Sequence, residues 1–437
     1  MAKKTKAADL SIEEKLEQAL VVPGYEPYKI PDNWCWTNLK TVCNLDNGIK
    51  HNNESLVYFD AKTLREITEP VSRNSGVIVE KGQKVILVDG ENSGEVFVIP
   101  DRGYMGSTFR ILNISKQFDE MYIRYFIDIF REELKKNKIG STIPHLNKEL
   151  FYGLQFPLPP LPEQQRIVER IESLFSKLDE AKEKAQEVID SFETRKAAIL
   201  HKAFSGELTA KWREENGVGI ESWERKTLGE VCNSIFDGDH MPPPKSESGI
   251  PFLVISNVND GYLSFENTRF VPQEYYDAIT DTRKPEKGDV LYTLVGSFGI
   301  PVVVDTNAPF CFQRHMALLK PKSINTYFLW YLLQSQEMYQ KASSIAKGVA
   351  QLTVPIKGLR LMDFNCPSEE EQIEIVRILD SLLEKEDTSK DNAESIIDQI
   401  ETMKKAILAR AFRGELGTND PEEESAVELL KQILTGE

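Results

Sequence analysis

Hydrophobic side chains recur at alternating steps of four and three residues in two distant parts of the chain. The first series, interrupted only by Arg195, is Ile167, Ile171, Leu174, Leu178, Ala181, Ala185, Val188, Phe192 and Ile199. The second has a polar break at Glu386 and Ser389, and its apolar members are Ile375, Leu379, Leu382, Ala393, Ile396, Ile400, Met403 and Ile407. A seam with this period is typical of a helix that lies along another helix. The pattern therefore predicts a pair of long helices.

The two helical parts are copies of one sequence. Residues 156–209 align without a gap with residues 364–417, and 25 of the 54 positions are identical. Unrelated segments of ordinary composition would agree at only about one position in fifteen. Pro162 suits the first position of a helix, and Gly206 and Gly414 are natural C-caps. At about 1.5 Å per residue, the first helix would span roughly 60 Å.

Two seams of equal length in one chain most simply pair with each other. Because each helix ends far from where it begins, an antiparallel pair is the economical arrangement. It would hold the intervening segments at opposite ends and bring the two chain ends close together. The alternatives are that each copy folds into a hairpin of its own, or that it pairs with a second chain.

The segments that precede the two helices are related to each other more weakly. At a constant offset of 189 residues, Trp34, Leu39, Val42 and Cys43 match Trp223, Leu228, Val231 and Cys232. Short β-branched or aromatic runs, punctuated by Gly, Asn and Pro, predict strands in both segments. The strands are expected at 85–88, 96–99, 252–255, 290–294 and 301–304, and helices at 122–134 and 327–339. One frame with diverged loops indicates two different specificities.

These patterns predict an α+β protein with a pseudo-two-fold internal repeat, in which two globular domains are separated by two long antiparallel, coiled-coil-like helices. Along the chain we expect an N-terminal helical extension (1–30), a first domain (31–155), a first helix (156–209), a second domain (210–363), a second helix (364–417) and an acidic C-terminal tail or helix (418–437). The stretches Ser11–Leu20 and Pro421–Leu434 are amphipathic, so each either covers the protein's own surface or docks on a partner.

Charge is distributed unevenly along the chain, whose net charge is −16. Residues 31–155 carry 16 basic and 17 acidic side chains, and residues 216–363 carry 14 and 16. Residues 364–437 carry 8 and 19, a net charge of −11. Two nearly neutral domains are not the basic footprint of an autonomous DNA-binding protein. If the chain binds DNA, partners must supply much of the phosphate neutralisation.

Motifs for catalysis are absent from the sequence. It has no G-x-x-x-x-G-K-[ST] phosphate loop, and no Asn-Pro-Pro or Asp-Pro-Pro run of the kind an amino-methyltransferase uses. The 5 cysteines form no C-x-x-C pair and the 5 histidines are isolated, so we expect no disulfide framework and no metal site. Cys43 and Cys232 fit buried strand positions, and Gly296–Gly299 fits a tight turn better than a phosphate cradle. Without a signal peptide or a long apolar run, a soluble cytoplasmic protein is expected.

Several motifs resemble those of one family, the specificity subunits of type I restriction–modification systems. The start of a conserved region in that family resembles G-S-T-I-P-H-L at 140–146 followed by F-P-L-P-P-L-P-E-Q-Q-R-I-V at 156–168, and its end resembles T-R-K-A-A-I-L-H-K-A-F-S-G-E-L-T at 194–209. P-Y-K-I-P-D-N-W at 27–34 is also typical, and residues 249–257 and 287–299 resemble segments inside a target recognition domain. The resemblance covers nearly the whole chain, in the order of the family.

The resemblance implies a non-catalytic subunit with two target recognition domains. Each domain would read one half of a bipartite double-stranded DNA site, and the helix pair would set the spacer and dock two modification (methyltransferase) subunits. S-adenosylmethionine is then expected on those subunits, and ATP with Mg on motor–nuclease restriction subunits, while this chain binds no cofactor itself. The alternatives are a coiled-coil scaffold whose globular domains bind proteins, and an enzyme that acts on nucleic acid alone, against which the missing motifs speak.

Reading of bases requires polar or basic side chains on loops that reach the groove edges. In the first domain the candidates are Asn47, Lys50, His51, Asn52 and Asn53 in a loop after an early strand, then Ser107, Thr108 and Arg110, and then Ser141, Thr142 and His145. In the second domain they are Asp239, His240, Lys245, Ser256, Asn257, Gln313, Arg314, His315, Lys347 and Gln351. For any single residue the alternative is a turn-former or a solvated surface side chain.

Overall fold

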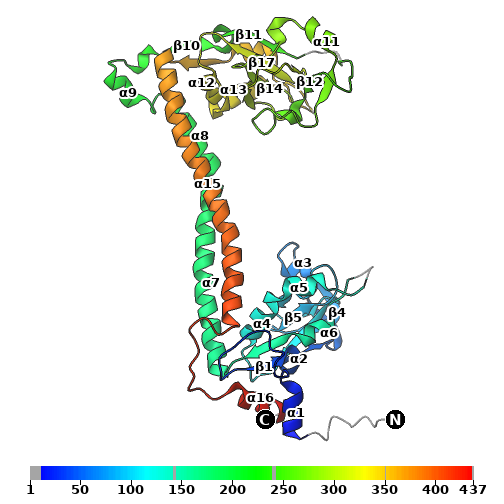
Figure 1. The fold of residues 1–437 in the computed structure, drawn as a ribbon. Coiled ribbons are helices and arrows are strands. Elements are labelled where there is room, and N and C mark those ends of the chain that lie inside the picture. Colours follow the sequence, from blue (N-terminus) through cyan, green and yellow to red (C-terminus); the bar gives the residue numbers. More distant parts are fainter. Residues whose placement is uncertain (1–10, 141–143, 239–242, 350, 436–437) are drawn as a thin grey trace. The chain divides into compact units, whose positions relative to one another are not determined.

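The computed structural model describes residues 11–140, 144–238, 243–349 and 351–435. The chain divides into two compact units, one made of Met1–Lys184 with Ile396–Glu437 and the other of Ala185–Ser395. Each unit contains one globular domain and parts of both long helices (Figure 1). Within the described ranges, no helix is both long enough and apolar enough to cross a membrane.

The globular part of the first unit contains two sheets and a small closed barrel. The two-stranded sheet is β1 (Cys35–Asn38) with β9 (Gln155–Leu158). The four-stranded antiparallel sheet has the order β2 (Cys43–Asp46), β8 (Phe109–Ile114), β5 (Lys84–Leu87) and β6 (Val96–Val98). The barrel is formed by β3 (Lys50–Phe59), β4 (Val71–Val79) and β7 (Gly103–Met105).

Besides the long helices, the first unit has shorter helices that pack into the same hydrophobic clusters as its strands. They are α1 (Ile12–Ala19), α2 (Leu39–Val42), α3 (Ala61–Leu64), α4 (Glu120–Ile129), α5 (Arg131–Lys136), α6 (Lys148–Gly153) and α16 (Ala426–Thr435). The single helix predicted at 122–134 is therefore two helices that meet at Phe130. In the core, Phe412 from the second helical repeat packs on Tyr122 and Phe126, with ring centroids 4.8 and 5.4 Å apart. The end of one repeat is thus part of the core of the first unit.

The second unit has the same plan, except that a three-stranded sheet replaces the barrel. A two-stranded sheet joins β10 (Glu224–Thr227) to β18 (Asp363–Cys366), and the four-stranded sheet has the order β11 (Cys232–Asp237), β17 (Met316–Pro321), β14 (Val290–Thr293) and β15 (Pro301–Val303). A three-stranded sheet of β13 (Arg269–Val271), β12 (Ile250–Leu253) and β16 (Cys311–Phe312) stands where the first unit has its barrel. The helices are α9 (Ala210–Glu215), α10 (Leu228–Val231), α11 (Gln273–Ala278), α12 (Thr326–Gln334), α13 (Gln336–Ile345) and α14 (Ile356–Leu361), with short 3-10 turns at Ile220–Ser222, Ile255–Asn257 and Asp281–Arg283.

The weakly matching framework positions take equivalent places in the two units. Cys43 and Cys232 are both buried at the first residue of a strand that follows a short helix. Burial raises the pKa of each thiol to about 12. The Gly296–Gly299 stretch joins β14 to β15 as a turn, with both glycines at positive φ. The strand predictions at 85–88, 96–99, 252–255, 290–294 and 301–304 correspond to β5, β6, β12, β14 and β15.

The long helices run antiparallel to each other within each unit. In the first unit Lys182 pairs with Glu401 at 2.9 Å and Asp179 pairs with Lys404 at 2.5 Å. In the second unit the Lys390 ammonium lies 5.0 Å from the centre of the Phe192 ring. Residue numbers rise along one helix as they fall along the other, so the repeats pair inside one chain.

The first repeat forms the predicted long helix with one local irregularity, across which Ser191 N still donates to the Glu187 carbonyl at 3.1 Å and Arg195 N to the Ser191 carbonyl at 3.0 Å. It consists of α7 (Leu161–Asp190) and α8 (Phe192–Phe204), whereas the second repeat is the uninterrupted α15 (Glu369–Ala411). Ser191 separates the two parts, and its hydroxyl donates to the carbonyl of Glu187 at 2.5 Å. A side chain that bonds to the preceding turn competes with the helix backbone and bends helices.

The polar residues that interrupt the two apolar series pair with each other. Arg195 Nε donates to Glu386 Oε2 at 2.6 Å, and both side chains are partly buried. The polar residue that breaks one apolar series therefore has its counter-charge at the break in the other. Ser389, the other polar residue of that break, is exposed.

The seam prediction is wrong for Ile396 and Met403, whose exposed fractions are 44% and 45%. Ala393 and Ile400 are buried, and Ile397 is half-buried between them. The buried stripe therefore passes through Ile397, because steps of four and then three from Ala393 reach it and Ile400. Among the remaining members of the two predicted series, Ala181 is also exposed. The buried members are Ile167, Ile171, Ala185, Phe192, Ile375, Leu379, Ala393 and Ile400, and the half-buried members are Leu174, Leu178, Val188, Ile199, Leu382 and Ile407.

The two amphipathic terminal segments lie side by side in the first unit (Figure 1). Ala19 of α1 and Ala426 and Leu430 of α16 are buried in the same core cluster. Their apolar faces therefore cover the protein's own surface, which is the simpler of the two interpretations of these segments.

Candidate nucleic-acid interface

A cavity of about 590 Å³ opens on the barrel of the first unit. It is lined by residues of β3 and β4, by the connection from β7 to β8 and by the loop before β3. The sequence candidates Asn47, Lys50, Asn52, Ser107 and Arg110 all line it. Residues that lie up to 63 positions apart in the sequence are thus brought to one place. We call this the basic cavity, since its lining includes Lys50, Arg73 and Arg110 and no Asp or Glu.

The register of the β3–β4 ribbon explains which side chains face the basic cavity. Lys50 lies opposite Val77 and Asn52 opposite Ser75. Side chains at alternate positions of paired strands share one face, so these four residues are directed to the same side. The register shifts between Asn52 and Leu56, where Asn53 has a φ of 78°. A bulge of this kind bends a strand and redirects its side chains.

Two contacts of the Tyr104 side chain hold the barrel closed behind the cavity. A Cβ at Gly76 would lie 2.9 Å from atoms of the Tyr104 ring, so this position needs glycine. The Tyr104 hydroxyl donates to the carbonyl of Glu54 at 2.9 Å, next to the bulge. These contacts fix the curved ribbon that carries Lys50 and Asn52.

The prediction that Asn47–Asn53 forms a loop is wrong for most of its length. Lys50, His51, Asn52 and Asn53 belong to the paired strand β3, although all four are exposed. The strand holds its place through pairing with β4, which the polar composition of both strands conceals. Asn47 remains in the connection that precedes β3.

The other candidates of the first domain are less closely grouped. Thr108 is half-buried in the β7–β8 connection, beside Ser107. His145 is bridged to Ile139, and its Nδ1 lies 2.6 Å from the Asp89 carboxylate. Ser141 and Thr142 lie outside the described residues.

The second unit has a cavity of about 440 Å³ that collects three of its candidates. Arg314, His315 and Gln351 line it, together with Asp237 and Thr353. Its lining thus combines a cation, a carboxylate and neutral hydrogen-bonding groups, in contrast to the basic cavity. The two domains present different chemistry on related frames.

In this second cavity, the surroundings of His315 shift its pKa. Burial and the neighbouring positive charge of Arg314 lower the pKa of His315 below its usual value of 6.5. Its Nδ1 lies 3.0 Å from Nε2 of Gln313, so these two candidates hold each other. Lys347 is exposed, and its backbone is bridged to Thr353 at the cavity edge.

Asn257 does not fit the role predicted for it. Its exposed fraction is 5%, its Oδ1 accepts from the Val254 amide at 3.0 Å, and its Nδ2 donates to the Glu266 carbonyl at 3.1 Å. The amide is used within the fold, so Asn257 is a buried turn residue. Lys245 and Ser256 are exposed. Asp239 and His240 lie outside the described residues.

Sequence reasoning missed the pair Arg73 and Tyr58 in the basic cavity. The Arg73 guanidinium carbon lies 3.4 Å from the centre of the Tyr58 ring, a cation–π contact. Ser75, also missed, lines the same wall. The only signal in the sequence is the polar run Ser72–Ser75 inside an otherwise apolar strand.

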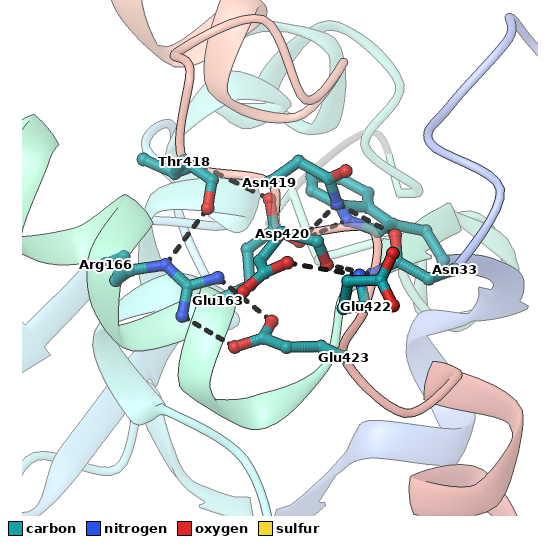
Figure 2. A network of polar contacts seen from close by, with 9 residues as sticks. Asn33, Glu163, Arg166, Thr418, Asn419, Asp420, Glu422 and Glu423 are labelled. Atoms are coloured by element: carbon teal, nitrogen blue, oxygen red, sulfur yellow. Dashed lines mark hydrogen bonds and ion pairs between the residues drawn. The ribbon is translucent and has the colours of Figure 1, made fainter.

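Each domain is fastened to the start of a long helix by a hydrogen bond from a tryptophan to a buried glutamate. In the first unit Trp34 Nε1 donates to Glu163 Oε2 at 2.7 Å. The same carboxylate accepts from Asn419 Nδ2 at 2.8 Å, and Arg166 pairs with Glu423 at 2.7 Å beside it (Figure 2). The segment that follows the second helix therefore completes the frame of the first domain.

The second unit has the same arrangement built from other residues. Trp223 Nε1 donates to Glu371 Oε2 at 2.8 Å, while Thr209 Oγ1 and Arg213 Nη1 donate to Glu371 Oε1 at 2.7 and 2.6 Å. Here the segment after the first helix supplies the additional donors. The adjacent glutamine repeats as well, since Gln164 and Gln372 each accept from a backbone amide at 3.0 and 2.8 Å.

Comparison with known families gives a match over both halves of the chain. Residues 31–190 and 220–401 match the type I restriction modification DNA specificity domain. The chain therefore belongs to this family, and it is a DNA sequence-specificity subunit, a non-catalytic component of a type I restriction–modification complex. The alternative of a protein-binding scaffold is not favoured.

Individual relatives agree with this assignment. The chain is 26% identical to the type I restriction enzyme EcoBI specificity subunit of Escherichia coli, over 92% of each chain. Its fold is similar to the HsdS subunit from Thermoanaerobacter tengcongensis, with a TM-score of 0.60 and 22% identity over 89% of this chain and 99% of that one. A chain from a structure concerned with complex assembly and conformational transition of the type I R-M system has a TM-score of 0.67 and 22% identity, over 89% of this chain and all of that one.

Proposed function

We propose that each globular domain reads one half of a bipartite double-stranded DNA site and that the paired helices set the spacer between the halves. The observation that carries this proposal is the pair of unlike cavities. One is lined by three cations without a carboxylate, and the other by Arg314, His315, Gln351 and Asp237. Two domains on one frame with different polar linings suit two different half-sites.

The hydrogen bonds between domain and helix support the spacer role. Trp34–Glu163 and Trp223–Glu371 place a hydrogen bond to a buried carboxylate where each domain meets the start of its helix. A buried, charge-assisted hydrogen bond is stronger than a neutral one and limits rotation at the joint. A domain fastened in this way keeps a fixed orientation to its own helix.

The partners and cofactors belong to the same proposal. The helix pair docks two modification subunits, which bind S-adenosylmethionine and methylate the DNA, and motor–nuclease subunits with ATP and Mg join for restriction. Family membership and the near-neutral charge of both domains support this dependence on partners. We expect the isolated chain to bind its site weakly and the assembled complex to bind it tightly, with the steeper dependence of log affinity on log salt.

An exchange of domains tests the proposal. Residues 31–155 are replaced by the corresponding domain of a relative with a known site, and the methylated sequence is then determined in cells that also contain the modification subunit. We expect one half-site to change and the other half and the spacer to persist. A change in both halves would contradict independent reading by the two domains.

A further inference from the structure

Positive charge in the first domain is not spread evenly, although the domain as a whole is nearly neutral. Four of its six arginines have a carboxylate partner: Arg65 with Glu95, Arg102 with Glu54, Arg124 with Asp128 and Arg131 with Glu95. Among the described residues, the two arginines without such a partner are Arg73 and Arg110, and both line the basic cavity. The unneutralised guanidinium groups of the domain are thus gathered at one place.

The two arginines are held in position by contacts that leave their charge uncompensated. Arg110 Nη1 donates to the carbonyls of Phe109 and Ser107 at 2.7 and 3.1 Å. Arg73 rests on the Tyr58 ring. Neutral carbonyls and an aromatic face orient a guanidinium without cancelling its charge. Fixed cations of this kind bind an anion at a smaller entropic cost than freely moving side chains.

The concave shape of the site favours one part of DNA over another. Base edges lie at the floor of a groove about 8.5 Å deep, so a protein reads them with a protruding element. Phosphates, by contrast, project from the outside of the duplex and fit into a hollow lined by donors. Lys50, Arg73 and Arg110 offer charged donors to phosphate oxygens, and Ser75 and Asn52 offer neutral ones.

We propose that the basic cavity binds backbone phosphates of the DNA beside the first half-site, with Lys50 and Arg73 as positioning residues and Tyr58 as the support of Arg73. This inference rests on the proposed function and assigns these residues to placing the duplex. The bases of the first half-site are then read by neutral side chains at the rim of the same cavity. Asn47 and Ser107, on the rim connections, are the nearest of the predicted candidates.

The test uses the full-length chain assembled with its modification subunit and measures the dissociation constant over a range of salt. Two unmethylated duplexes are compared, one that contains the sequence the complex methylates in cells and one that lacks it. The variants are Lys50→Gln and Arg73→Gln, and Lys40→Gln is the control, since Lys40 is exposed on α2 outside the cavity and loses the same charge. Each cavity variant should reduce the slope of log affinity against log salt by about one, and weaken both duplexes by the same factor.

Two further variants separate phosphate contact from base reading and from damage to the fold. Arg73→Lys keeps the charge and should retain most of the slope, because a phosphate accepts a point charge. Tyr58→Leu should weaken binding less than Arg73→Gln, since the cation remains but loses its support. Uncharged methylphosphonate linkages placed next to the half-site should weaken the wild-type complex, and they should weaken Arg73→Gln by a smaller factor because one phosphate contact is already lost.

Each contrary result has a distinct meaning. Unchanged slopes, or an equal loss in Lys40→Gln, would overturn the phosphate assignment. A changed preference at one base pair in Arg73→Gln would also overturn it, because the residue would then be reading a groove edge. A wild-type complex that fails to distinguish the two duplexes would instead contradict the proposed function itself.

Discussion

Replacing Glu371 by alanine should favour local unfolding of the second unit far more than replacing its counterpart, Glu163, favours local unfolding of the first. Glu371 is 1% exposed and accepts from Arg213, whose side chain is 9% exposed, as well as from Thr209 and Trp223. In Glu371→Ala the buried guanidinium loses its counter-charge, which costs about 3–5 kcal/mol. Arg213 keeps only its hydrogen bonds to Gly206 and Thr209.

Glu163→Ala is the matched control. Glu163 is equally buried, yet its hydrogen-bond donors Trp34, Asn419 and Thr418 are uncharged, and Arg166 has Glu423 as its partner. Unpaired neutral donors cost about 1–3 kcal/mol. The difference of about 2 kcal/mol corresponds to roughly a thirtyfold larger opening equilibrium constant in the second unit.

Hydrogen exchange of the full-length chain under native conditions measures these openings separately. Amides in the first turns of α15 and in β10 report on Glu371→Ala, and amides in the first turns of α7 and in β1 report on Glu163→Ala. The double variant Arg213→Ala/Glu371→Ala should recover part of the loss, because no buried charge is left unpaired. The reasoning is refuted if Glu163→Ala opens its unit as much as Glu371→Ala opens the other.

Three further predictions follow from local structure. Gly76→Ala should destabilise the first unit by about 1–3 kcal/mol because the new Cβ meets the Tyr104 ring, whereas Gly153→Ala, with nothing within 4 Å, should be nearly neutral; chemical unfolding compares them. All five cysteines are buried, and the pKa of the Cys35, Cys43 and Cys232 thiols is about 12, so these thiols are scarcely ionised at pH 8. A disulfide reagent should therefore label the chain quickly only after unfolding, and rapid labelling of the native chain would oppose this. His315 should titrate below pH 6.5 by NMR. Because its pKa is lower in the folded than in the unfolded state, the second unit should lose stability as pH falls through 6.5, and His315→Asn should remove this loss. A titration midpoint at or above 6.5 would disprove the effect.

The features that the sequence predicts well are those that repeat or alternate over a long stretch. The two helical repeats and the strands β5, β12 and β14 have apolar patterns that leave few alternatives. The irregularity at Ser191 could not be predicted in this way, because the apolar series continues across it. The meeting of Arg195 with Glu386 also depends on the register of two distant helices.

The candidate site was harder to predict than the fold for a physical reason. β3 and β4 expose most of their polar residues, so neither strand shows an alternating apolar pattern, and Lys50–Asn53 reads as a loop. Arg73 gains its position from Tyr58, a residue 15 positions away on the paired strand. Asn257 fails as a candidate for the opposite reason, since its amide is consumed by a turn that a polar residue in isolation does not reveal.

The central claim is that this chain alone decides which DNA sequence its complex modifies, one half through each domain. The most direct measurement is the complete pattern of methylated bases in a host that carries the modification subunit, with and without this chain. We predict a single bipartite motif, with an unspecified spacer, that appears only when the chain is present. A methylation pattern that does not depend on the chain, or one continuous motif without a spacer, would contradict the account.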